Sequence, residues 1–291
     1  MRNVASFSAL LATVTLVWSA AQIGGAAAGG SGTVWATPHD SYSSSVGVLG
    51  CKVDTNRIAY WPSSVSCDAL CVELSYEGRS VKLLKVDQSG GAFDVSYDAW
   101  NYLYTGKGAR EQPTAGGTVA MQYRDLDAGE CASLIHTDGH RLPLSAANSM
   151  NFLASCLDQP GGSWVGRNYQ LYNVLDPICT WGKDEACELK DWPNTNQASC
   201  PSTMGAPVAL TSAPVYNIRY PSGQEVEAGS GEARKDSGAA GGSGGIGGGS
   251  LKHPVMGGWA VYLMTLVVGH VLFDTMMQRF FFSPSLLNIP T

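Results

Sequence analysis

Three short segments in the first half of the chain alternate apolar and polar residues with a period of two. They are "LCVELSY" (residues 70–76), "RSVKLLKV" (79–86) and "TVAMQYR" (118–124). In the first and third, one face collects Val72, Leu74, Tyr76, Val119, Met121 and Tyr123. Such alternation is typical of half-buried strands, and Glu77-Gly78 between the first two segments is a tight-turn signal. The pattern predicts a compact β-rich unit over residues 33–135.

One helix is predicted within this unit, shortly after a Gly-Gly turn. Ser96 can cap its first turn through the side-chain hydroxyl, and Asp98 would lie favourably at the positive end of the helix dipole. Val95 and Trp100 are spaced as a hydrophobic staple, and Gly106 is a plausible stop. Strand, hairpin, turn, helix and strand together predict an all-β fold, a barrel with a short inserted helix, rather than a doubly wound sheet.

The pattern changes after residue 135. Residues 136–220 carry four of the eight cysteines with scattered tryptophans, which indicates a loop-rich extension held by disulfides. Residues 221–254 include the tract "GAAGGSGGIGGGS", which cannot bury enough apolar surface to fold. We therefore expect a barrel, a cysteine-rich extension and a disordered linker, in that order.

Apolar runs at both ends of the chain indicate export and attachment to a membrane. Residues 1–21 have the features of a signal peptide, with Arg2 before an apolar run and small residues after it. Residues 255–277 form a C-terminal apolar helix long enough to span a bilayer, although they contain His270 and Asp274. A removed lipid-anchor signal, with attachment near residues 237–240, is the alternative. Both interpretations predict a secreted, extracellular barrel tethered at the cell surface.

The charge and cysteine content of the chain limit which macromolecular partners and which metal sites can be expected. The formal net charge is −6 and lysine and arginine form no cluster, so nucleic acid is excluded as a partner. Eight cysteines in an exported chain indicate four disulfides. A zinc site is not expected, because Cys67-x-x-x-Cys71 lacks a second close pair. The "HTDGH" segment (136–140) has the character of a solvated turn, and we expect neither a metal nor a cofactor.

The main candidate for chemistry is the stretch "KVDQSGGAFDVSYDAW" (85–100), in which Asp87 and Asp94 flank the Gly-Gly turn. Two carboxylates can perform acid–base chemistry or hold a ligand. Each can also accept hydrogen bonds from the amides of a turn or a helix start. The residues favour this structural role for Asp87 and leave both roles open for Asp94.

Together these segments resemble the double-psi β-barrels of the cerato-platanin, barwin and expansin family. The resemblance rests on "SCDALCVELSYEGRSVKLLKVDQSGGAFDVSYDAW", on "GGTVAMQYRDLDAGEC" and on "HDSYSSSVGVLGC" further upstream. It covers residues 33–135 and leaves out the cysteine-rich extension and the tail. It implies a six-stranded double-psi barrel in a secreted, fungal-type protein, with a shallow polar groove across the barrel.

The resemblance also implies two disulfides, Cys51–Cys67 and Cys71–Cys131, out of the three pairings that four cysteines allow. The remaining four cysteines are then assigned as Cys156–Cys179 and Cys187–Cys200, without further support from the residues themselves.

By the same resemblance, Asp94 lies on the groove floor and Asp87 and Asp40 are further acids of the groove. Hydrolysis with inversion needs two carboxyls about 6.5 to 9.5 Å apart, one acting as acid and the other as base. Asp94 can take the acid role, but Asp40 is out of register with the family motif that supplies the base. Candidates for stacking on sugar rings are the aromatic residues Tyr42, Tyr60 and Trp61.

The sequence therefore predicts non-hydrolytic binding of cell-wall polysaccharide, either chitin or β-glucan, by a secreted monomer. Wall loosening or an elicitor or effector role at a host surface is the setting that the resemblance implies. One alternative is a weak inverting endoglucanase with Asp94 as acid and Asp40 as base. The other is a structural surface protein without a ligand.

Overall fold

A computed structural model describes residues 29–234. The predicted signal peptide (1–21), the apolar segment (255–277) and most of the predicted linker (221–254) lie outside these residues. In the described part of the chain, no helix is both long enough and apolar enough to cross a bilayer.

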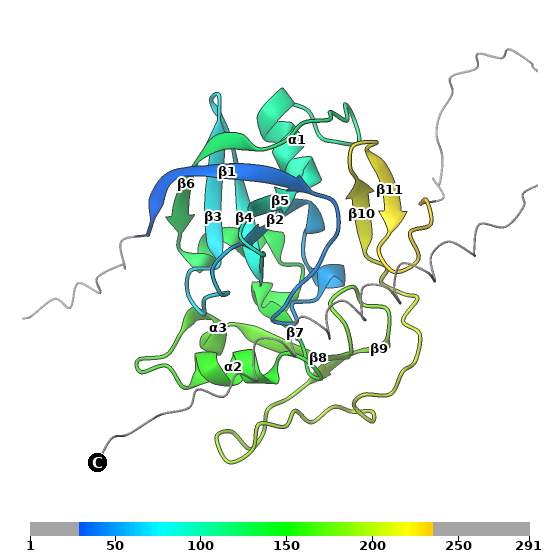
Figure 1. The fold of residues 1–291 in the computed structure, drawn as a ribbon. Helices are drawn as coiled ribbons and strands as arrows, with labels where there is room; N and C mark the ends of the chain where they lie inside the picture. The colour runs from blue at the N-terminus through cyan, green and yellow to red at the C-terminus, as the bar shows by residue number, and fades with distance from the viewer. Residues whose placement is uncertain (1–28, 235–291) are drawn as a thin grey trace, which may run out of the picture. The chain divides into compact units, whose positions relative to one another are not determined.

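Six strands close into a barrel in the order β1-β5-β2-β4-β3-β6 (Figure 1). They are β1 (Ser31–His39), β2 (Ile58–Trp61), β3 (Cys71–Tyr76), β4 (Arg79–Gln88), β5 (Phe93–Ser96) and β6 (Val119–Leu126). The pairs β1–β5 and β2–β4 are parallel, and the other neighbours are antiparallel. The alternation places Val72, Leu74 and Met121 in the barrel core, fully buried. The prediction of a closed six-stranded barrel is confirmed.

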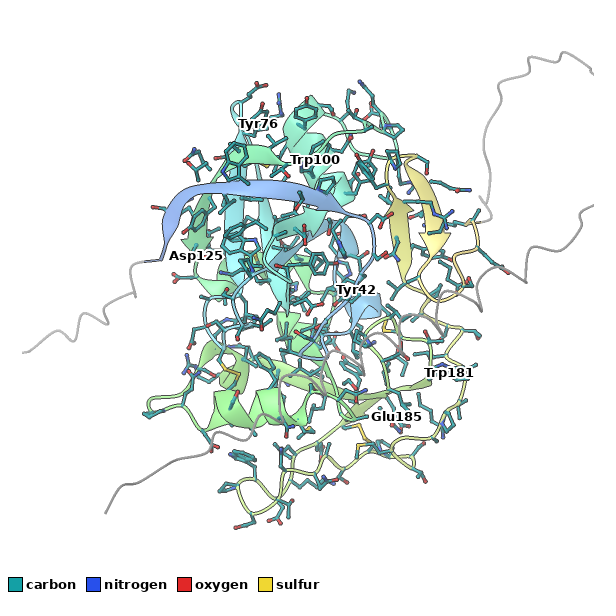
Figure 2. The ribbon with its side chains drawn as sticks, viewed as in Figure 1. Tyr42, Tyr76, Trp100, Asp125, Trp181 and Glu185 are labelled. Atoms are coloured by element: carbon teal, nitrogen blue, oxygen red, sulfur yellow. A yellow bond between two sulfur atoms is a disulfide. The ribbon has the colours of Figure 1, made fainter. Side chains whose placement is uncertain are left out.

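The inserted helix α1 (Tyr97–Thr105) packs on the same core through Trp100, which Figure 2 labels. Gly106 ends the helix as predicted, with a φ of 84° that favours glycine. The predicted capping role of Ser96 is wrong. Its hydroxyl donates to the Thr55 carbonyl over 2.7 Å and accepts the Ile58 N–H over 3.0 Å, so it joins β5 to β2 instead of capping the helix.

The cysteine-rich extension contains more regular structure than its composition predicts. It includes helices α2 (Met150–Leu157) and α3 (Trp164–Arg167) and a sheet of strands β7 (Leu142–Ser145), β8 (Tyr169–Val174) and β9 (Gly182–Cys187). Short 3-10 helices η1 (Gly50–Lys52), η2 (Thr55–Arg57), η3 (Ala128–Leu134) and η4 (Asp138–His140) lie in the connections. A second apolar core joins the extension to β2 and β4 through buried residues that include Ile58, Leu84, Val86, Leu142, Leu144 and Leu171.

A hairpin of β10 (Tyr216–Arg219) and β11 (Gln224–Glu227) follows the extension. The linker boundary predicted at residue 221 is therefore wrong, because Val226 is a buried strand residue. Two hydrogen bonds of 2.9 Å attach the hairpin to the segment after β1. The Tyr220 N–H donates to Asp40 Oδ2, and the Tyr42 N–H donates to Asn217 Oδ1.

The structure contains four disulfides, of which Cys71–Cys131 and Cys187–Cys200 match the predicted pairs. The predicted Cys51–Cys67 and Cys156–Cys179 pairs are wrong, because the structure pairs Cys51 with Cys179 and Cys67 with Cys156. Hydrogen bonds to the extension accompany the disulfides of Cys51 and Cys67. The Gly50 N–H donates to the Pro177 carbonyl over 2.8 Å, and the Val165 N–H donates to the Cys67 carbonyl over 3.0 Å.

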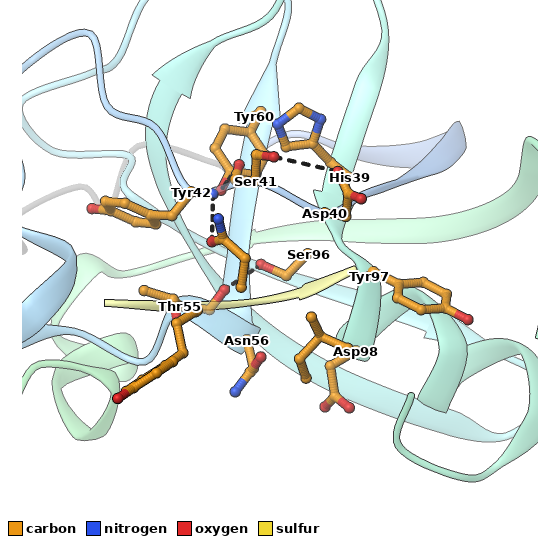
Figure 3. A pocket seen from close by; sticks show the side chains of 13 residues that line it. His39, Asp40, Ser41, Tyr42, Thr55, Asn56, Tyr60, Ser96, Tyr97 and Asp98 are labelled. Carbon is orange, nitrogen blue, oxygen red and sulfur yellow. Dashed lines mark hydrogen bonds between the residues drawn. The ribbon is translucent and has the colours of Figure 1, made fainter. Parts of the chain in front are cut away.

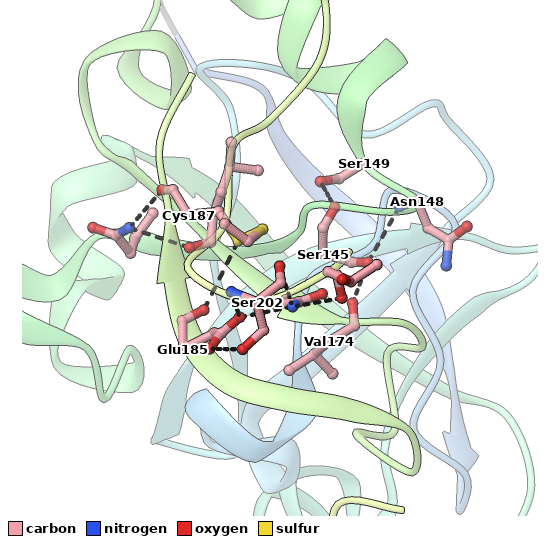
Figure 4. Close-up of a disulfide and its surroundings, with 12 residues drawn as sticks. Ser145, Asn148, Ser149, Val174, Glu185, Cys187 and Ser202 are labelled. Atoms are coloured by element: carbon pink, nitrogen blue, oxygen red, sulfur yellow. Dashed lines mark hydrogen bonds between the residues drawn. A yellow bond between two sulfur atoms is a disulfide. The ribbon is translucent and has the colours of Figure 1, made fainter. Parts of the chain in front are cut away.

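Glu185 on β9 holds residue 202 against the sheet, as the close-up in Figure 4 shows. Its Oε1 accepts hydrogen bonds of 2.8 Å from Asn173 Nδ2 and from the Ser202 N–H, and its Oε2 accepts one of 3.0 Å from Ser202 Oγ. The bond from Asn173 is the largest cause that lowers the pKa of Glu185 below its usual value of 4.5.

We expect acid to weaken this attachment. Because the pKa of Glu185 is lower in the folded than in the unfolded protein, its stabilising contribution is present above about pH 4.5 and is lost as the pH falls through the folded-state pKa. The midpoint of urea unfolding should therefore fall less between about pH 6 and pH 3 in Glu185→Gln than in the wild type. An identical fall in both proteins would contradict the assignment.

Candidate functional site

Asp94 shares the outer face of the barrel with an exposed tryptophan of the neighbouring strand. Val34 and Ala36 point into the core, so Trp35 and Thr37 of β1 point outward. Thr37 pairs in register with Asp94 of β5, and its hydroxyl donates a hydrogen bond to Asp94 Oδ1. Trp35 is 64% exposed, and residues two apart on a strand are separated by about 6.6 Å. We call Trp35, Thr37 and Asp94 the outer strip.

A β-bulge between β2 and β4 places Asp87 opposite the same residue of β2 that pairs with Asp94. The register between β2 and β4 shifts after Ala59, which places Asp87 opposite Tyr60, and Tyr60 also pairs with Asp94 on its other side. Burial is the main cause that raises the pKa of the Tyr60 hydroxyl, and the charges of Asp87 and Asp94 raise it further. Asp87 of β4 and Asp94 of β5 therefore flank Tyr60 of β2 on its two sides.

The carboxylates of Asp87 and Asp40 hold backbone segments in place. Asp87 accepts hydrogen bonds from Ser43 Oγ over 2.5 Å and from the Ser45 N–H over 2.9 Å, so it fixes the loop after β1. Asp40 accepts the Tyr220 N–H described above. Figure 3 shows Asp40 at the edge of a space of about 10 Å³, the size of a single water molecule, between barrel and hairpin. For Asp87, the contacts match the structural role that the residues favoured.

The three aromatic side chains predicted to stack on sugars are buried, which corrects that prediction. Tyr42, Tyr60 and Trp61 are only 5%, 4% and 6% exposed. The Tyr42 hydroxyl donates to the Val48 carbonyl over 2.9 Å inside the second core. The Tyr60 hydroxyl donates to the Ser41 carbonyl over 3.2 Å, and Trp61 belongs to the barrel core. Trp35 is the exposed ring that the prediction missed, although its place between two buried small residues could have indicated it.

A cavity of about 220 Å³ opens at one end of the barrel, lined by Trp61, Lys85, Asp87, Asp125 and serines of the loop after β2. Lys85 Nζ lies 2.7 Å from Asp125 Oδ1 and 4.9 Å from the centre of the Trp61 ring. Figure 2 labels Asp125 near the end of β6. The Trp61 indole N–H is buried without an acceptor among residues 29–234. In the same range, no three His, Cys, Asp or Glu side chains gather as metal ligands.

Comparisons with known proteins identify one similar solved structure. No family model matches the chain, and no curated protein matches it. A crystal structure of cerato-platanin 2 from M. perniciosa is 20% identical, and the match covers 34% of this chain and 98% of that one, with a TM-score of 0.26. The closed six-stranded barrel is consistent with the resemblance noted in the sequence.

The outer strip has the chemistry of a surface that binds hydroxyl-rich ligands. An exposed indole offers a flat apolar face, on which the CH face of a sugar can pack. Thr37 is the hydrogen-bond partner that residues 29–234 provide for Asp94, and the half-buried carboxylate has lone pairs left for ligand hydroxyls. The cavity adds serine hydroxyls as donors beside the Lys85–Asp125 ion pair.

Proposed function

We propose that this protein is secreted and binds neutral cell-wall polysaccharide, chitin or β-glucan, without cleaving it. The outer strip is the binding surface, with Trp35 stacked on a sugar ring and Asp94 accepting hydrogen bonds from sugar hydroxyls. The observation that carries the proposal is that Trp35 is 64% exposed on the same outer face as the hydrogen-bonded Thr37 and Asp94. An aromatic ring that stands exposed on the same face as a polar acceptor offers a flat apolar surface that a sugar ring can cover.

Four disulfides are typical of a protein that works outside the reducing cytosol. We further propose that the barrel has the double-psi topology, which the parallel pairing of β1 with β5 and of β2 with β4 supports. Attachment to the cell surface through residues 255–277 stays a prediction, because these residues lie outside the described part of the chain.

Binding without hydrolysis is supported by the contacts of the acids around Asp94. An inverting enzyme needs a second carboxylate that is free to activate water. Asp87 and Asp40 instead accept hydrogen bonds from the backbone of the loop after β1 and of the hairpin. These contacts give both carboxylates a structural role in holding the backbone.

Pull-down with insoluble chitin, cellulose and β-glucan, together with a reducing-sugar assay, tests this function. We expect the full-length protein to bind at least one glycan and to release no sugar. Asp94→Asn should weaken binding severalfold, because an amide accepts more weakly than a carboxylate. Asp158→Asn changes the same charge at an exposed position after α2 and is the matched control.

Two results would contradict the proposal. Release of reducing sugar that disappears in Asp94→Asn would identify a hydrolase. Absence of binding to all three glycans would favour a structural protein without a ligand.

A further inference from the structure

An open groove of about 680 Å³ lies at the edge of the β7–β8–β9 sheet. Its volume is in the range of pockets that bind small ligands. Residues at the starts of β7 and β8 line one part of it, and the chain between Cys187 and Cys200 lines the other. The Cys187–Cys200 disulfide closes that segment, so the groove has a covalently fixed wall.

Two arginines line this groove, and the strand topology explains why both reach it. β7 and β8 are parallel and pair from Leu142 opposite Tyr169, so the residues just before them come to the same edge. Arg141 directly precedes β7, Arg167 ends α3 two residues before β8, and both line the groove with exposed side chains. Arg167 is also oriented by a long hydrogen bond of 3.5 Å to the Gly161 carbonyl.

The charge of these arginines is not balanced by neighbouring acids. Most lysine and arginine side chains among residues 29–234 form ion pairs, but neither Arg141 nor Arg167 has a carboxylate partner there. The remaining charged groups of the groove, Lys190 and Glu188, pair with each other over 3.2 Å. In a chain with a net charge of −6, the groove is thus a local positive site.

We propose that this groove binds an acidic oligosaccharide, in which uronate carboxylates pair with Arg141 and Arg167. The planar guanidinium fork matches a carboxylate through two parallel hydrogen bonds. The half-buried ring of Tyr169 supplies a flat surface beside the arginines for the sugar itself. The site is built from other residues than the outer strip, and the inference does not depend on the proposed binding of neutral glycan.

Titration calorimetry of the full-length protein with a galacturonate hexamer tests the proposal. We expect binding that weakens as salt is raised, because the contacts are between exposed charges. The double variant Arg141→Gln/Arg167→Gln should lose about tenfold or more in affinity, as expected when two charge-assisted contacts are removed. Arg219→Gln removes an exposed arginine of β10 that also lacks a carboxylate partner among residues 29–234 and should leave binding unchanged.

Three outcomes would overturn the inference. The double variant could bind the hexamer as the wild type does, or a neutral galactose hexamer could bind equally well. Displacement by inorganic phosphate at the same concentration as galacturonate would show a simple anion site without sugar recognition. The chitin pull-down separates this site from the outer strip, because the double arginine variant should bind chitin like the wild type.

Discussion

Trp35→Ala should remove most of the binding to chitin or β-glucan while leaving the fold intact. Burying an aromatic side chain under a ligand is worth about 1.5 to 3 kcal/mol, which corresponds to a loss of about 10- to 100-fold in affinity. Because the ring is 64% exposed and outside both apolar cores, its removal opens no cavity. Depletion from solution by insoluble glycan, measured over a range of glycan concentrations, gives the affinity of each variant.

Trp181 provides a matched control for this experiment. It is 45% exposed and directly precedes β9 in the extension, whereas the outer strip lies on β1 and β5 of the barrel. Trp181→Ala should bind as the wild type, and Trp35→Phe should keep part of the affinity because a smaller flat ring remains. Equal binding by Trp35→Ala and wild type would exclude the outer strip as the binding surface.

Removing the Cys67–Cys156 disulfide should cost more stability than removing Cys187–Cys200. The two bridges close loops of 89 and 13 residues, for which chain entropy predicts about 4.5 and about 3 kcal/mol. Cys67→Ala/Cys156→Ala also removes the covalent link between the loop after β2 and α2, and leaves the loop held by hydrogen bonds such as that from the Trp164 N–H to Asp68 Oδ1 over 2.7 Å. Urea unfolding followed by tryptophan fluorescence measures the difference.

Peptide mapping without reduction tests the pairing itself. Protease fragments should join the segment around Cys51 to that around Cys179, and the segment around Cys67 to that around Cys156. A fragment that joins Cys51 to Cys67 would show that the barrel carries its own local disulfide. The extension would then be held to the barrel by the shared apolar core alone.

The barrel could be predicted because its signals are local. The period-two alternation of 70–76 and 118–124 reflects strands with one face in the core, and Glu77-Gly78 gives the turn of a hairpin. In the structure both turn residues have positive φ, 47° and 79°, as a two-residue hairpin turn requires. Gly106 stops α1 for a similar backbone reason. Each of these choices depends on residues within a few positions of one another.

The site could be predicted only in part, because burial is decided by distant segments. Asp94 and Asp87 were found from their turn, but Tyr60 and Tyr42 are covered by chain whose position depends on Asn217 and Tyr220. Nothing in the sequence around Tyr42 indicates that its backbone N–H bonds to Asn217, which is 175 residues away. Two of the four cysteine pairs were predicted wrongly for the same reason, since Cys51 and Cys67 each bond to a cysteine of the extension.

The attachment of the β10–β11 hairpin has a consequence for where the chain can be cut. Composition places the end of folded structure at residue 220, but a protease acting there would remove β11, the strand that pairs with β10, and would cut the chain next to Tyr220, whose N–H donates to Asp40. Cleavage after residue 234, within the glycine tract, would leave these contacts whole. A protein cut there would keep the complete barrel, the extension and the hairpin.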